Sequence, residues 1–195
     1  MRSPERPPLA ASDSRLLLEL ARRSIEHGLG TGRALVVDPQ DYSEPLRAPG
    51  AAFVTLRVGD ELRGCTGELE AWRPLVASVV HHAYSAAFRD PRFPAMTARE
   101  LGQLVLHISV LGPLEPLDAR SEPGLLACLQ RGVDGLLIDD GLHRATFLPA
   151  VWDSLPEAAE FLRELKHKAG LREDAWPSGL RAWRYRAEEI PRPGA

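Results

Sequence analysis

The stretch that decides the fold is residues 52–67, which read AFVTLRVGDELRGCTG. Residues 52–58 are rich in apolar, β-branched and aromatic side chains, a composition typical of a strand. Gly59-Asp60 is a turn signal, and the residues from Glu61 onward predict a returning strand. We therefore expect an antiparallel hairpin whose second strand runs into the glycine-containing segment 62–67.

Segment 62–67, LRGCTG, places an arginine, a thiol, a hydroxyl and two glycines on one short piece of backbone. Gly64 and Gly67 allow close approach of other groups, and the amides of such a turn can converge on an anion or a carbonyl oxygen. Arg63 puts a fixed positive charge beside Cys65, which favours the thiolate. The segment is therefore the candidate reactive or binding site.

Cys65 has two interpretations. It is either a nucleophile, redox-sensitive thiol or metal ligand, or a small buried residue where the strand meets the turn. A nucleophilic thiol needs a base, and the nearby sequence contains none. Folding would have to supply the base from His81, His82, His107 or His143. Cys128 lies on the apolar side of a predicted short helix and is assigned to packing.

A second motif, residues 90–94 (DPRFP), must end a helix because two prolines lie within four positions. Arg92 in this motif and Arg63 are candidates for holding a carboxylate or phosphate, since guanidinium groups grip such anions bidentately. The alternative for each arginine is an internal salt bridge, for example to Asp90 or Glu68. We expect the motif both to shape the site and to present Arg92.

The rest of the chain mixes hairpins and helices without regular βαβ units, which favours an α+β fold with mainly antiparallel pairing. Capping boxes are predicted at Thr97/Glu100 and Ser154/Glu157, and residues 38–50 form a long loop. Predicted helices cover residues 12–27, 74–88, 123–131 and 154–169. Predicted strands cover residues 52–58, 104–111, 136–138, 143–148 and 181–187, together with a returning strand from residue 61 onward whose flank at 68–72 is also strand-like.

Composition excludes several classes of function. The 195 residues carry a net charge of −3, which gives no electrostatic reason to expect nucleic acid. No apolar run approaches the roughly 18 residues of a membrane span, and the N-terminus lacks the apolar core of a signal peptide. Two cysteines make no disulfide framework, so a cytoplasmic location is expected.

We predict a disordered arm over residues 1–11, a single domain over 12–190 and a loose tail over 191–195.

No metal site is expected. His81 and His82 are adjacent, so on a helix they point about 100° apart and cannot easily chelate one ion. Asp139 and Asp140 precede a glycine and are explained by a hairpin turn. His107 and Ser109 share one face of the predicted strand 104–111 and are candidates for lining a cleft.

Taken together, four motifs closely resemble the AMMECR family, protein A of the AmmeMemoRadiSam group: residues 62–67, 86–94, 107–111, and 134–136 followed by 144–149. The resemblance extends from about residue 14 to 187. It implies an α+β fold of mainly antiparallel sheet packed with helices, with a main and a smaller lobe and a cleft lined by the signature residues. Thr66 departs from the aliphatic residue usual in the family and adds a hydroxyl to the turn.

The family implies no single reaction. We expect either a small anionic ligand or an accessory catalytic role at this cleft, or alternatively a non-catalytic scaffold for a Memo-type or radical SAM partner. The chain lacks a C-x3-C-x2-C cluster, so no cofactor is assigned and radical chemistry would belong to the partner. Whether the protein is itself an enzyme stays open. Cys65 is the candidate catalytic residue, and the candidate binding residues are Arg63, Gly64, Thr66, Gly67, Asp90, Arg92, Phe93 and Ser109.

Overall fold

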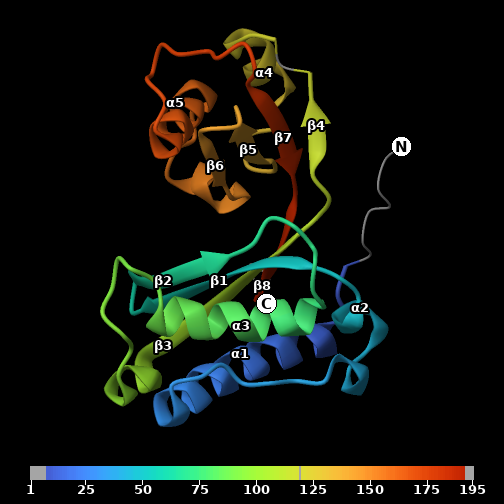
Figure 1. Cartoon of the computed structure of the whole chain (residues 1–195), viewed down its shortest axis with the longest axis vertical. Helices are drawn as coiled ribbons and strands as arrows, with labels where there is room; N and C mark the ends of the chain where they lie inside the picture. The colour runs from blue at the N-terminus through green and yellow to red at the C-terminus, as the bar shows by residue number, and fades with distance from the viewer. Residues whose placement is uncertain (1–7, 119, 192–195) are drawn as a thin grey trace. The chain divides into compact units, whose positions relative to one another are not determined.

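The computed structural model describes residues 8–118 and 120–191, which fold as two compact units. The N-terminal unit contains residues 8–111 and 188–191, and the C-terminal unit contains residues 112–118 and 120–187. Each unit has a four-stranded sheet and its own helices (Figure 1). The strand pairs whose register is described are all antiparallel, which confirms the predicted α+β class.

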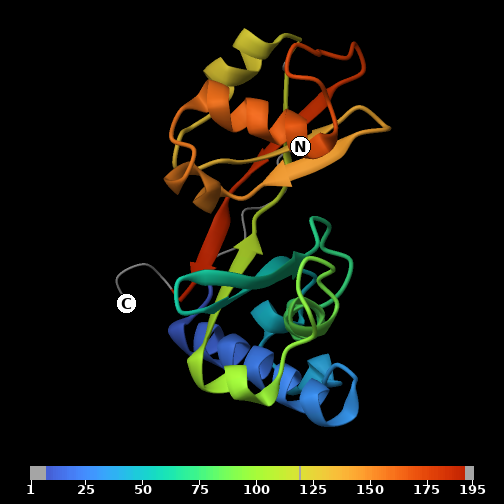
Figure 2. The same cartoon turned by 90° about the vertical axis from the view of Figure 1, so that its left-hand side faces the viewer.

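The sheet of the N-terminal unit has the strand order β2-β1-β3-β8. Its strands are β1 (Ala51–Val58), β2 (Glu61–Gly67), β3 (Leu104–Leu111) and β8 (Ala187–Ile190). Helices α1 (Ala11–Thr31) and α3 (Leu75–Phe88) lie on the same side of this sheet in Figures 1 and 2. The connections hold the short helices η1 (Pro39–Asp41), α2 (Glu44–Arg47) and η2 (Ala98–Gln103).

Alternation along the strands gives this sheet two different faces. The face toward the helices is apolar and includes Val54, Leu56 and Ile108, which are fully buried in the core with α1 and α3. Burial of each such side chain contributes roughly 1.5–3 kcal/mol. The opposite face, which we call the outer face, carries the cross-strand rows Leu62–Arg57–Val105, Cys65–Thr55–His107 and Gly67–Phe53–Ser109, with Glu189 beside Ser109.

The sheet of the C-terminal unit has the strand order β4-β7-β5-β6. Its core is centred on Trp152 and Phe161, whose rings stack with centroids 3.9 Å apart. The ammonium of the buried Lys166 donates to Glu122 at 2.9 Å and to the carbonyl of Glu173, which satisfies its charge inside the unit. The elements are β4 (Glu115–Leu117), α4 (Glu122–Cys128), β5 (Gly135–Asp139), β6 (Arg144–Phe147), η3 (Pro149–Asp153), α5 (Ala158–Ala169) and β7 (Arg181–Tyr185).

Several local predictions need correction. Helix α4 ends at Cys128 instead of residue 131. The capping box predicted at Ser154 does not form, because helix α5 begins at Ala158 and Glu157 occupies its N-cap without a side-chain bond. By contrast, the box of Thr97 and Glu100 is present. Strand β2 ends at Gly67, so the strand-like flank predicted over residues 68–72 forms no strand. Strands β4 and β8 were not predicted, and the predicted loop 38–50 contains η1 and α2.

The predicted N-terminal arm lies mostly outside the described residues. Where it is described, Leu9 is buried and donates its N–H to the Glu188 carboxylate at 3.0 Å, and α1 begins at Ala11. All but the first residue of the predicted tail 191–195 also lies outside the described residues. The two units agree with the expected main and smaller lobes, and a single domain over 12–190 stays a prediction. Among the described helices, none combines the length and the apolar character that crossing a bilayer requires.

Candidate functional site

The two sequence motifs meet at the peptide of Cys65. Its N–H donates to Oδ2 of Asp90 at 2.9 Å, and its carbonyl accepts from Nη2 of Arg92 at 3.3 Å. Arg92 also donates to both oxygens of Asp90, through Nε at 2.9 Å and Nη2 at 2.7 Å. Because of these bonds, the pKa of Asp90 lies well below its usual range. The Asp90–Arg92 pair therefore clasps the backbone of Cys65 on both sides.

This clasp explains why the motifs occur together. Strand β2 is at the edge of its sheet, so within the described part of the chain one side of it has no strand neighbour. Unpaired backbone groups on an edge strand can pair with other chains and are usually covered. Asp90 and Arg92 bind the N–H and the carbonyl of Cys65 that face away from β1. Only 3% of the Asp90 side chain is exposed.

Arg63 is also held inside the protein. It occupies the bulge of β2, where the register with β1 shifts. Its Nε lies 2.5 Å from Oε1 of Glu100, and its Nη2 donates to the carbonyl of Pro94 at 2.9 Å. The Arg63 side chain, with bonds from Thr97, lowers the pKa of Glu100 to about 2. Nη1 of Arg63 is buried and has no partner among the described residues.

The two glycines of segment 62–67 are needed for close packing. A Cβ on Gly64 would overlap the carbonyl oxygen of Ala86 in helix α3, so glycine lets the strand touch the helix backbone. A Cβ on Gly67 would overlap the ring of Phe53, which lies over it on the outer face. Between them, Thr66 turns toward α3 and its hydroxyl donates to the carbonyl of His82 at 2.9 Å.

The thiol of Cys65 lies on the outer face, partly exposed. The hydroxyl of Thr55 donates to its Sγ at 3.3 Å. His107 is in the same cross-strand row but beyond Thr55. With strands about 4.8 Å apart, it sits roughly 10 Å from Cys65 along the row. Burial and the charge of Arg57 lower the pKa of His107, and the register does not place its ring as a base beside the thiol.

Ser109 belongs to the next row of the outer face. It is buried, and its hydroxyl donates to Oε2 of Glu189 at 2.9 Å. Oε1 of Glu189 is buried and has no hydrogen-bond partner among the described residues. Burial raises the pKa of this carboxyl. Ser109 and Glu189 thus form a polar pair across β3 and β8 on the outer face.

The predicted site residues therefore lie in three places. Arg63, Asp90, Arg92 and Phe93 gather along the edge of β2, with the Phe93 ring centroid 6.0 Å from the Arg63 guanidinium carbon and 5.5 Å from that of Arg92. The Cys65 thiol, Gly67 and Ser109 lie on the outer face, and Gly64 and Thr66 face α3. Internal pairing, the alternative weighed for both arginines, is what the structure contains. Sequence reasoning did not single out Thr55, Glu100 or Glu189 as parts of this arrangement.

His82, one of the two adjacent histidines, belongs to a separate buried cluster. The ring of His82 lies 3.7 Å from Oε1 of Glu68, which also accepts from Ser78 at 2.6 Å and pairs with Arg73 at 3.3 Å. Burial lowers the pKa of His82 to about 4. Over residues 8–118 and 120–191, no three His, Cys, Asp or Glu side chains are grouped so as to hold a metal ion.

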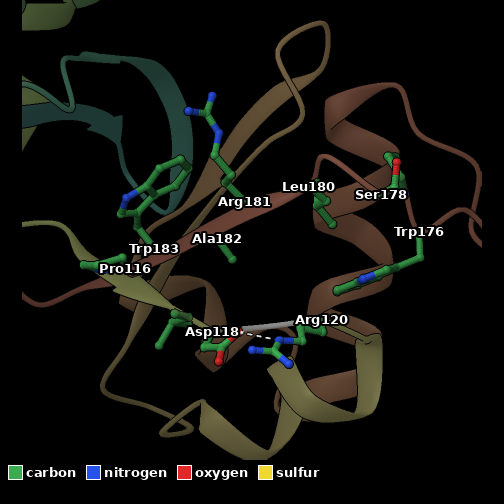
Figure 3. Close-up of a pocket in the computed structure, with 11 residues that line it drawn as sticks. Pro116, Asp118, Arg120, Trp176, Ser178, Leu180, Arg181, Ala182 and Trp183 are labelled. Carbon is green, nitrogen blue, oxygen red and sulfur yellow. Dashed lines mark ion pairs between the residues drawn. The ribbon is translucent and has the colours of Figure 1, made fainter.

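The C-terminal unit holds an open cavity of about 480 Å³ (Figure 3). Trp176 and Leu180 line it from the loop before β7, and Asp118 and Arg120 form an ion pair of 3.4 Å at its margin. None of the predicted site residues lines this cavity. The cavity is therefore not part of the site predicted from the sequence.

Comparison with known proteins gives one consistent result. The model of the family described as AMMECR1 matches residues 18–190. A protein of Thermofilum pendens is 41% identical, covering 92% of this chain and 90% of its own length. A protein of Methanothermobacter thermautotrophicus is 36% identical, covering 93% and 95%.

A solved structure shares the fold. The crystal structure of the uncharacterized protein PH0010 from Pyrococcus horikoshii matches with a TM-score of 0.85 and 31% identity, covering 95% of this chain and 96% of that one. The expected resemblance is thus confirmed over nearly the whole length. The chain belongs to the AMMECR1 family.

Proposed function

We propose that this protein is a binding component that recognises its partner through the outer face of the N-terminal sheet, without using Cys65 as a nucleophile. The observation that carries this proposal is the setting of the thiol: its neighbour on the outer face is the hydroxyl of Thr55, which donates to Sγ. Nucleophilic catalysis by cysteine needs an adjacent base or another activating group. The cross-strand register places His107 beyond Thr55.

The outer face has the mixed character of a recognition surface. At one end, Leu62 and Val105 are 38% and 44% exposed on either side of Arg57. In the middle the thiol, Thr55 and His107 are partly exposed, and at the other end Ser109 is buried. Apolar groups beside an arginine, with polar groups further along, are typical of interfaces. Following the family resemblance, we assign the partner to the Memo-type proteins or the radical SAM enzymes, in the cytoplasm.

The experiment measures the affinity of the full chain for a purified Memo-type protein and for a purified radical SAM protein by titration calorimetry. We expect Val105→Glu to weaken binding at least tenfold, because it buries a charge in the interface. Cys65→Ser should bind like the wild type. Val36→Glu is the matched control, since Val36 is 91% exposed in the same unit but outside the outer face. Equal binding by Val105→Glu, or loss of binding with Cys65→Ser, would overturn the proposal.

One observation favours a second candidate, recognition of a small anion at the edge of β2. Arg92 is 54% exposed, and its bonds to Asp90 and Cys65 use only Nε and Nη2. Its third nitrogen is therefore available for a carboxylate or phosphate. Inorganic phosphate or acetate should then raise the melting temperature of the wild type but not that of Arg92→Lys. Arg99→Lys, an exposed position on η2, is the control. An equal response of all three proteins would exclude this candidate.

A further inference from the structure

Glu189 differs from three other carboxylates of the N-terminal unit that are partly or fully buried. Asp90 is paired with Arg92, Glu100 with Arg63 and Glu68 with Arg73. Glu189 receives a single bond, from the neutral hydroxyl of Ser109, and makes no ion pair with any described residue. Its carboxylate therefore has no cationic partner among the described residues.

The strand β8 directs this carboxylate onto the outer face. Ile190 packs in the core with the helices, and Glu188 bonds the N–H of the core residue Leu9. Because successive side chains alternate, Glu189 points to the opposite side, where it meets Ser109. Phe53 is the cross-strand partner of Ser109, but its ring lies over Gly67 on the other side of β1. The polar groups at this end of the outer face are therefore the Ser109 hydroxyl and the Glu189 carboxylate.

A buried carboxylate without a cation is costly, and an incoming positive group would remove that cost. We propose that Glu189 and Ser109 form a recognition site for the ammonium or guanidinium group of a lysine or arginine side chain on the protein partner. The carboxylate of Glu189 would pair with the charge of that side chain. A bound metal ion fits less well, because the described residues supply no group of three metal ligands.

This inference adds a specific contact to the proposed function. It rests on that function for the protein partner whose lysine or arginine carries the positive charge. Charge complementarity selects a basic partner residue: the carboxylate lacks a counterion, whereas the arginines at the edge of β2 already have theirs. A pair formed in a partly buried site is worth more than one at the rim, because the surrounding dielectric constant is lower.

The first arm of the test uses the full chain alone, with n-butylguanidinium as the probe and n-butanol as its uncharged match. The side-chain carboxyl carbon of Glu189 is followed by NMR against pH, and Glu189→Gln identifies its signal. The cation should lower the midpoint of the Glu189 titration by about 1 pH unit, a tenfold preference for the ionised form. Butanol should leave it unchanged. The same midpoint with and without the cation would overturn the site.

The second arm repeats the partner titration with Glu189→Gln, which keeps the shape of the side chain and removes its charge. We expect about tenfold weaker binding than wild type and a smaller dependence on salt. Glu61→Gln, an exposed position on β2 at the opposite edge of the same sheet, should bind like the wild type. Wild-type affinity in Glu189→Gln would overturn the lysine or arginine assignment while leaving the proposed function intact. The wild type could instead bind neither partner protein while n-butylguanidinium still shifts the Glu189 titration. That result would overturn the proposed function and the assignment of the cation to a protein partner.

Discussion

Oδ2 of Asp90 accepts the backbone N–H of Cys65 at 2.9 Å, across 25 residues of sequence. The bond joins the segment directly after helix α3 to the edge strand β2. Through it, the motif at residues 90–94 pairs with backbone groups of the segment 62–67. The side chain of Asp90 is almost completely buried, so the groups that it binds have no ready substitute in water.

Asp90→Ala should lower the free energy of unfolding by about 2–3 kcal/mol, less than the ~3–5 kcal/mol typical of a broken buried pair because Arg92 is half exposed. The substitution leaves the N–H of Cys65 and the guanidinium of Arg92 without their acceptor. Urea unfolding followed by circular dichroism measures the change. Asp60→Ala, at the exposed hairpin turn, is the control and should change little. If both variants unfold at the same urea concentration, the clasp contributes nothing to stability.

Gly64→Ala tests the contact between β2 and α3. A Cβ there overlaps the backbone oxygen of Ala86, which cannot rotate away. Overpacking of this kind costs typically 1–3 kcal/mol, and we expect at least ~2 kcal/mol by urea unfolding. Gly102→Ala is the matched control, because its Cβ would meet no atom within 4 Å. A Gly64→Ala variant as stable as the control would show that the strand can shift away from the helix at little cost.

The thiol chemistry of the chain gives a third prediction. Cys65 is partly buried and its sulfur accepts a hydrogen bond from Thr55, whereas Cys128 is exposed. Iodoacetamide should therefore modify Cys128 at least about tenfold faster than Cys65, because alkylation requires access to the sulfur. Mass spectrometry of timed digests measures both rates in one sample, and unfolding in urea should make them similar. Faster reaction at Cys65 in the folded protein would restore the nucleophile interpretation.

Local sequence signals account for much of this fold. The hairpin of β1 and β2 follows from an alternating run and a Gly-Asp turn, and the box of Thr97 and Glu100 from a four-residue pattern. The prolines after Asp90 correctly predict the end of α3. Each of these features depends on residues that are close in the chain, where short-range sterics and hydrogen bonds decide the outcome.

The parts that the sequence did not reveal depend on distant contacts. Ser109 and Glu189 are 80 residues apart, and Arg63 and Glu100 are 37 apart. Strand β8 has only four residues, including two glutamates, and its place in the N-terminal sheet depends on pairing with a strand from far earlier in the chain. The sequence analysis offered Asp90 or Glu68 as examples of a carboxylate partner, whereas Arg63 pairs with Glu100, which only the tertiary fold brings close.

Acid should weaken the protein through its two arginine-bound carboxylates. Arg63 lowers the pKa of Glu100 to about 2, and Arg92 lowers that of Asp90 still further below its ordinary value. Unfolded Glu and Asp titrate near ~4.3 and ~3.9. Because the folded pKa values are depressed, the stabilisation is fully present above about pH 5 and is lost as the pH falls toward about 2. Urea midpoints of the wild type and Glu100→Gln should therefore differ most at pH 7 and converge in acid. Glu61→Gln, which is exposed, should follow the wild type throughout. A difference between wild type and Glu100→Gln that stays constant from pH 7 to 2 would show that ionisation of Glu100 is not its source.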